Sequence, residues 1–226
     1  GCQTYDFEPV DPLAISQTTE VRSIKARPRK PNLMLLVDTS GSMTLPVDSS
    51  LPACKTGKGG TCGSEDEPCN TATCPTRWSE LQSAMKDFLD SSGSIARIGL
   101  ARYPDPEQGS ASCGASTALS VPLPADDAED EVSLVKNANL VRDQLQAIKN
   151  ASTKGEPVPV GGTPTSQSLL FLGNRPELQS DEHSDIVLLL TDGLPNCNEN
   201  FPDPYDASKG PGQACFCTLT NCGSDY

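Results

Sequence analysis

The chain has 226 residues, which suits one ordinary domain with extensions, and its 30 acidic and 17 basic residues give a formal net charge of −13. So acidic a chain is repelled by phosphate backbones, which argues against a nucleic-acid partner. No apolar run approaches the roughly 20 residues that a membrane-spanning helix needs. The 20 prolines and 18 glycines predict that much of the chain is loop.

Ten cysteines are many for a chain of this length. Most lie among Gly, Pro and Asn, which predicts disulfides formed in an oxidising compartment. Zinc is the alternative, with Cys69 and Cys74 or Cys215 and Cys217 as ligands, but neither spacing is C-x2-C. The sequence does not determine the pairing. The candidate disulfide cysteines are Cys54, Cys62, Cys69, Cys74, Cys113, Cys197, Cys215, Cys217 and Cys222.

The chain opens with Gly1-Cys2-Gln3, which resembles the remnant of a bacterial lipobox. This resemblance implies that Cys2 is lipidated, and Gln3 in place of Asp implies sorting to the outer membrane. The alternative is an added glycine in front of a structural cysteine. Residues 3–31 contain several prolines and no lasting period, which predicts a tether over residues 1–31.

The first regular elements are predicted from residue 33 onward. Residues 33–37 are an unbroken apolar run that ends at Asp38, as is typical of a central parallel strand covered on both faces. Residues 43–75 hold four cysteines among Gly, Pro, Thr and Ser, which predicts an inserted loop stapled by disulfides. Helical spacing returns at residues 77–90, with Thr76 as the N-cap.

Two strands and a helix are predicted next, over residues 95–103, 118–123 and from about residue 131. The acidic run 126–131 suits the positive N-terminus of that helix better than a calcium loop. The helix carries apolar residues at alternating steps of four and three, which predicts one buried face. That face consists of Leu134, Ala138, Val141, Leu145 and Ile148.

The last predicted elements are a short helix and a wholly apolar strand. Thr163-Pro164 opens the helix and Gly173 ends it. Residues 186–190 form the strand, which is followed by Thr191-Asp192-Gly193 and a cysteine-rich segment, 195–226.

Strands alternating with helices predict an α/β fold with a doubly wound, mostly parallel sheet, helices on both faces and disulfide-rich loop insertions, over residues 32–226. Ligands of such sheets bind beyond the carboxyl ends of the strands. Asp38 and Asp192 each follow the carboxyl end of an apolar strand. The pattern therefore directs two carboxylates at one crevice.

Asp38, Ser40 and Ser42 alternate along a turn in which we expect Gly41 to permit the bend. A carboxylate with two hydroxyls is a hard oxygen set, which suits Mg²⁺, then Mn²⁺, and Ca²⁺ less well. Thr163 would add a hydroxyl and Asp192 a carboxylate, directly or through water. If Asp192 acts through water, the ion can still accept an anionic oxygen from a partner. The alternative interpretation makes the serines and Thr163 helix caps.

The pieces Asp38-x-Ser40-x-Ser42, Gly-Gly-Thr163-Pro and Thr191-Asp192-Gly193 together resemble the metal-ion-dependent adhesion site of von Willebrand factor A and integrin inserted domains, over about residues 32–194. The resemblance implies that the first three residues hold the ion, that Thr163 binds it directly when ligand is engaged, and that Asp192 often acts through water. Family members continue with two further strands and helices, so we expect the natural protein to extend past Tyr226.

The N-terminal cysteine, the tether, this domain and the cysteine-rich loops also resemble outer-membrane lipoproteins of myxobacterial gliding motility. This resemblance implies a lipid-anchored cell-surface adhesin rather than an enzyme. It would bind an acidic group of a protein or substratum through Mg²⁺ and contact other envelope motility proteins.

Two alternative functions remain open. One is an envelope protein–protein interaction module whose metal is purely structural. The other is a metal-dependent hydrolase, such as a phosphatase with Asp38 as nucleophile, which Ser40 disfavours because such enzymes carry a second Asp there. His183 stands alone in an acidic loop, and we expect it at the surface, without an acyl-transfer triad.

Overall fold

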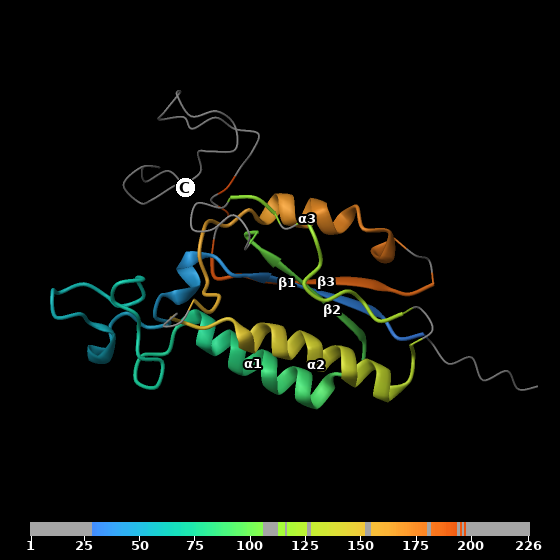
Figure 1. Cartoon of the computed structure of the whole chain (residues 1–226), viewed down its shortest axis with the longest axis horizontal. Helices are drawn as coiled ribbons and strands as arrows, with labels where there is room; N and C mark the ends of the chain where they lie inside the picture. Colours follow the sequence, from blue (N-terminus) through green and yellow to red (C-terminus); the bar gives the residue numbers. More distant parts are fainter. Residues whose placement is uncertain are drawn as a thin grey trace, which may run out of the picture.

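The structure is a computed structural model that describes residues 29–105, 113–115, 117–125, 128–151, 155–179, 182–193, 195 and 197. Its sheet has three parallel strands in the order β2-β1-β3 (Figure 1). The predicted strands at 33–37, 95–103 and 186–190 are confirmed, and the first of them is central. The strands are β1, Asn32–Asp38; β2, Arg97–Tyr103; and β3, Asp185–Leu190.

Helices cover both faces of the sheet (Figure 1). Helices α1, Arg77–Ser92, and α2, Glu131–Ala147, lie on one face, and α3, Thr165–Gly173, lies on the other. Because side chains of a strand alternate between faces, β1 contributes to two cores. Leu35 and Val37 pack with α1 and α2, and Met34 and Leu36 pack with Leu172 of α3. The described residues therefore form a parallel α/β arrangement.

Helix α1 begins at a capping box, which confirms the predicted N-cap. The Thr76 hydroxyl accepts from the Ser79 backbone N–H at 3.1 Å, and the Ser79 hydroxyl accepts from the Thr76 N–H at 2.9 Å. The two bonds satisfy donors that a helix start leaves free. The apolar face of α1 buries Trp78, Met85 and Leu89 against the sheet.

Helix α2 confirms the predicted apolar face, whose five side chains are at most 2% exposed. Its N-cap is Asp130, which accepts from the Ser133 N–H at 2.9 Å. Ile148 lies just after the last helical residue and still packs into the same core.

One element prediction was wrong, and the start of another element lies one residue later than predicted. Residues 118–123 do not form a strand: Val121 makes one antiparallel bridge to Leu100, and Pro122 and Pro124 beside it have no N–H to continue the ladder. The predicted short helix is confirmed and ends at Gly173 as predicted. It begins at Thr165, so Pro164 is its N-cap rather than its first residue, and Thr163 is not the capping residue.

Strand β3 is bordered by β1 alone in the described part of the chain, and its side chains are largely exposed. Ile186, Val187 and Leu188 are 48%, 40% and 39% exposed. The wholly apolar sequence therefore predicts the strand correctly but does not determine whether its side chains are buried.

No helix among the described residues is long and apolar enough to cross a membrane.

The insertion between β1 and α1 extends beyond the carboxyl end of the sheet and is cross-linked by disulfides (Figure 1). It contains two short 3-10 helices, Gly41–Thr44 at its start and Pro52–Cys54. Its disulfides are Cys54–Cys74 and Cys62–Cys69, and a third disulfide joins Cys113 to Cys197. The prediction of disulfides is confirmed for these six cysteines.

The zinc alternative is wrong for Cys69 and Cys74, because each belongs to a disulfide. Sulfur atoms of Cys54, Cys62 and Cys74 lie within 4.8 Å of one another, but oxidised sulfur is not the thiolate that binds metal. Cys2, Cys215, Cys217 and Cys222 lie outside the described residues, as does most of the predicted tether.

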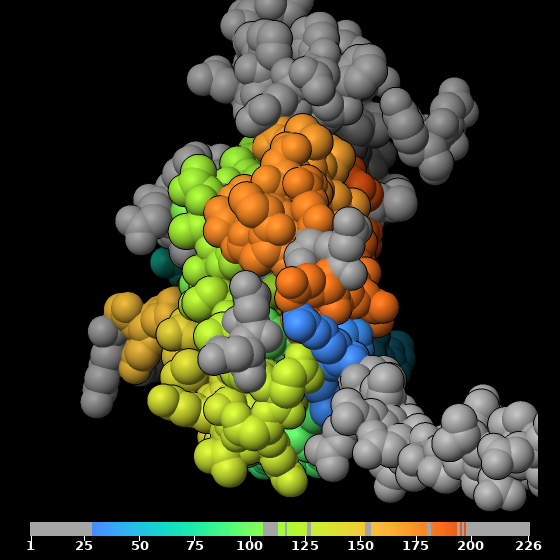
Figure 2. Space-filling model, turned by 90° about the vertical axis from the view of Figure 1, so that its right-hand side faces the viewer, coloured from blue at the N-terminus to red at the C-terminus, as the bar shows by residue number. Residues whose placement is uncertain are grey.

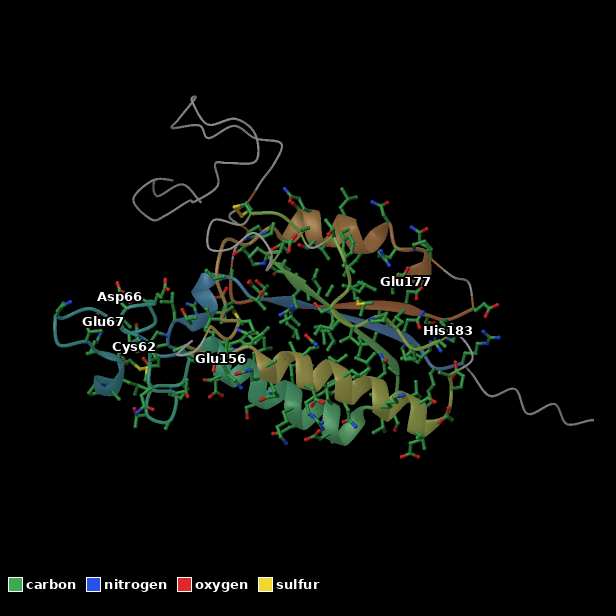
Figure 3. The ribbon with its side chains drawn as sticks, viewed as in Figure 1. Cys62, Asp66, Glu67, Glu156, Glu177 and His183 are labelled. Atoms are coloured by element: carbon green, nitrogen blue, oxygen red, sulfur yellow. A yellow bond between two sulfur atoms is a disulfide. The ribbon has the colours of Figure 1, made fainter. Side chains whose placement is uncertain are left out.

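His183 lies at the amino end of the sheet (Figure 3), the end that faces the viewer in Figure 2. The residue is buried, so its prediction as a surface histidine was wrong. Its side chain is 2% exposed, and its Nδ1 lies 2.8 Å from the Lys30 carbonyl. The Lys30 N–H donates to Glu129, just before α2, at 2.9 Å. Segments distant in sequence thus cover the histidine, which local composition does not reveal.

Candidate metal centre

The carboxyl ends of β1 and β3 hold two carboxylates at one edge of the sheet. Asp38 is the last residue of β1 and is fully buried, and Asp192 follows β3 by two residues. The Ser40 N–H donates to Asp38 Oδ1 at 2.8 Å, and the Thr191 hydroxyl donates to Asp38 Oδ2 at 2.7 Å. The loops after both strands therefore fix the orientation of the buried carboxylate.

The two serines connect this carboxylate to the second one. Ser40 Oγ and Ser42 Oγ are 3.1 Å apart, and the Ser42 hydroxyl donates to Asp192 Oδ1 at 3.0 Å. The structure thus brings Asp38, Ser40, Ser42 and Asp192 together, although about 150 residues separate the first loop from the last.

Thr163 follows a turn that docks directly onto the Asp38 loop. The Val160 N–H donates to the Thr39 carbonyl at 2.8 Å, and the Gly41 N–H donates to the Gly161 carbonyl at 3.0 Å. The Thr163 residue is 3% exposed. Two backbone hydrogen bonds therefore hold the second predicted piece of the site, which contains Thr163, against the first.

The glycine that the site requires is Gly161 rather than Gly41. Gly161 has a φ of 89°, which L side chains rarely adopt. Gly41 lies in the first 3-10 helix without a positive φ, and a Cβ there would make ordinary contact with the Gly161 carbonyl at 3.6 Å. The expected reason for Gly41 was therefore wrong.

Burial dominates the electrostatics of Asp38. Desolvation raises the pKa of its carboxyl, the bonds from Ser40 and Thr191 lower it, and the nearby charge of Asp192 raises it again. A buried carboxylate beside a second one disfavours its own charged form, and a bound cation would relieve that repulsion. The charge pattern thus fits a cation site.

Two further residues belong to this site and were missed from the sequence. Tyr103 pairs with Asp38 in the β1–β2 register and is fully buried, and its hydroxyl accepts from Thr165 at 3.5 Å. Burial is the main cause that raises the Tyr103 pKa. Tyr103 could have been found from the sequence, because Asp38 and Tyr103 each end a strand that was predicted to be parallel to the other.

The other missed residue is Arg77, the first residue of α1. Its Nη1 donates to Asp192 Oδ2 at 2.6 Å and lies 3.5 Å from the Ser42 carbonyl. The Asp192 side chain is 6% exposed and that of Arg77 is 38% exposed. The insertion separates Arg77 from Ser42 by 35 positions, so no local motif includes it.

An open pocket of about 570 Å³ lies beside this ion pair, between α1, the first 3-10 helix and the end of β3. Most of its surface is apolar, with charged groups from Arg77, Glu80 and Asp192. Its lining residues are Met43, Val47, Arg77, Glu80, Leu81, Ala84, Leu189, Leu190, Thr191 and Asp192.

The ligand chemistry of the gathered residues fits a hard divalent ion. Two carboxylates and two serine hydroxyls present oxygen only, with no thiolate or imidazole among them. Such a set could hold Mg²⁺ or Mn²⁺ and offers few charged ligands to Ca²⁺.

Comparisons of the chain with protein-family models, curated proteins and solved structures gave no significant match.

Proposed function

We propose that this chain is a binding module of the von Willebrand factor A class, with a doubly wound sheet and a metal-ion-dependent adhesion site. In this proposal Asp38, Ser40 and Ser42 hold Mg²⁺, with Mn²⁺ as a substitute. Thr163 and Asp192 complete the site, and an acidic group of a partner binds at the position left open. The chain is then an adhesion protein rather than an enzyme.

The observation that carries the proposal is the chain of contacts from Asp38 through Ser40 and Ser42 to Asp192 at the carboxyl edge of a parallel sheet. Ligand sites of open α/β sheets lie at that edge. Its residues come from separate loops, so a helix cap does not explain the arrangement. Ser40 does occupy the N-cap position of the first 3-10 helix, but its hydroxyl makes no capping bond there.

We further propose that this module lies on a bacterial cell surface. Lipidation at Cys2 would anchor it in the outer membrane, residues 1–31 would act as the tether, and the domain would bind a protein or substratum during gliding motility. This assignment derives from the resemblance of the sequence, and the disulfides among the described residues support an oxidising compartment.

The first test is metal binding by the whole chain. We expect isothermal titration to show one Mn²⁺ or Mg²⁺ per chain, and Asp38→Ala to weaken the affinity at least about 100-fold because a direct ligand is lost. Asp66→Ala is the matched control, since Asp66 is an exposed carboxylate in the insertion, away from the site (Figure 3). Equal affinity in both variants would remove the proposed site.

A second test separates adhesion from a purely structural metal. Adhesion of surface-immobilised protein to substratum should fall in EDTA, return with Mg²⁺, and stay low in Asp38→Ala. If metal raises the melting temperature but leaves adhesion unchanged, the ion only stabilises the fold. Hydrolysis of a generic phosphate ester that disappears in Asp38→Ala would instead favour the hydrolase alternative.

A further inference from the structure

We infer that Arg77 is a specificity-determining residue of this site: it neutralises Asp192, so that the site binds divalent ions more weakly and anionic ligands more strongly than its two carboxylates alone would. The inference rests on the proposed function, because it concerns the same site. It assigns a role to a residue that lies outside the three sequence pieces of the adhesion motif.

The geometry places both oxygens of Asp192 in hydrogen bonds. Oδ1 accepts from the Ser42 hydroxyl at 3.0 Å, and Oδ2 accepts from the Arg77 guanidinium at 2.6 Å. A carboxylate held on both sides in this way is oriented by its neighbours and shares its charge with a cation of the protein itself. Because both oxygens already accept hydrogen bonds, Asp192 would contact a bound ion through a water molecule more readily than as a direct ligand.

The position of Arg77 makes this arrangement persistent. Arg77 is the first residue of α1, immediately after the Thr76 capping box, so its backbone is fixed by the helix start. The Arg77 N–H also donates to the Leu45 carbonyl at 3.0 Å, which ties the same residue to the chain just after the metal loop. The Arg77 side chain thus extends to Asp192 from a backbone that the helix start holds in place.

The charge count then predicts the ligand class. With Asp192 compensated by Arg77, the negative charge that faces a dication comes from Asp38 alone. A site occupied by a dication then keeps about one net positive charge, whereas two free carboxylates would cancel it. Such a site selects an acidic side chain or another anionic oxygen, and a neutral hydroxyl or amide binds poorly.

Mn²⁺ titration of the whole chain at low ionic strength tests the inference. We expect Arg77→Gln to tighten Mn²⁺ binding about tenfold, because a positive charge close to a dication is removed and Asp192 is freed. A lesion that only damages the fold would weaken metal binding, which is the opposite sign. We also expect acetate, added as a carboxylate probe, to change the water-proton relaxivity of bound Mn²⁺ less in Arg77→Gln than in wild type.

Arg175→Gln is the matched control, because it removes the same charge from an arginine paired with Glu177, which lies toward the amino end of the sheet (Figure 3). It should leave Mn²⁺ affinity within about twofold of wild type, since the charge removed lies at the other end of the sheet and acts on the ion only weakly at that distance. Mn²⁺ affinity in Arg77→Gln equal to or weaker than wild type overturns the inference while leaving the metal site intact.

Two further outcomes are decisive. If the wild-type chain binds no Mn²⁺, the proposed function fails and this inference with it. If Arg77→Gln does not fold, Arg77→Lys decides, because lysine keeps the charge with a shorter reach to Asp192. It should bind Mn²⁺ at least as tightly as wild type, and weaker binding overturns the inference.

Discussion

Two clusters in the loops at the carboxyl end of the sheet are held together by opposite means. The oxygen cluster, formed by Asp38, Ser40, Ser42, Thr191 and Asp192, is connected by hydrogen bonds between loops far apart in sequence. The cysteine cluster, formed by Cys54, Cys62, Cys69 and Cys74, is connected by two covalent bonds within one insertion.

The difference shows which interactions stabilise each region. The four cysteines form a buried cluster of their own, apart from the apolar cores that pack on the sheet, so this part of the insertion has covalent links where a domain would have an apolar core. The oxygen cluster instead lies at the edge of a packed sheet, which can tolerate a buried carboxylate next to a second one. We therefore expect the cysteine cluster to contribute stability and the oxygen cluster to contribute binding.

The largest expected effect comes from removing the outer disulfide of the insertion. Replacing Cys54 and Cys74 together with Ser should lower the free energy of unfolding of the insertion by about 3 kcal/mol, because the disulfide closes a loop with a sequence separation of 20. Limited proteolysis should then cut the insertion while α1 and the sheet stay protected.

The matched pair is Cys62 and Cys69, whose disulfide closes a separation of only 7. Its replacement by Ser should cost about 2 kcal/mol, since the entropy of loop closure grows slowly with length. Mn²⁺ affinity should change little in either double variant. A large loss of affinity would show that the insertion supports the oxygen cluster, and the separation of roles would fail.

Asp38→Asn tests the oxygen cluster, for which we expect a contribution to binding and none to stability. Because burial raises the Asp38 pKa, its charged form is disfavoured in the fold, and a neutral side chain of the same shape should raise the melting temperature in EDTA. The same variant should lose Mn²⁺ binding. A lower melting temperature in EDTA would mean that Asp38 stabilises the fold, contrary to the role assigned to its cluster.

Thr76 lies where the insertion meets α1, so its removal tests the boundary between the two regions. Thr76→Ala should lower the free energy of unfolding by about 1–2 kcal/mol, because the helix loses its cap and Asn150 loses the hydroxyl that donates to it at 2.5 Å. Thr76→Ser keeps the capping oxygen and should stay close to wild type in urea unfolding. Equal losses in both variants would assign the effect to the methyl group.

The smallest effect is expected at Asp130, which caps α2 away from both clusters. Hydrogen bonds from Ser133 lower its pKa, so its contribution is present above the ordinary value of 3.8 and is lost as the pH falls through the lower folded pKa. Asp130→Asn keeps a good cap without the charge. Wild type should therefore melt slightly higher than Asp130→Asn at pH 7, and the difference should disappear as the pH falls through the lowered pKa of Asp130.

Local chemistry was enough to predict most elements of the described chain. The apolar run before Asp38, the face of α2 and the Thr76 cap each depend on side chains within a few turns or one strand of one another. The Val121 segment was misjudged because apolar residues suggested a strand where prolines prevent a ladder. The burial of His183 was missed because its cover comes from the segments around Lys30 and Glu129.

The sequence by itself determined the parallel α/β arrangement of the described part of the chain, its strand ends, and the oxygen-bearing residues placed just after those ends, because periodicity and composition are local properties. The tertiary structure decided which cysteines pair, that Gly161 rather than Gly41 makes the required turn, and that Arg77 bonds Asp192 across 115 positions. Such contacts depend on where the sheet brings distant loops, and no spacing along the chain encodes that.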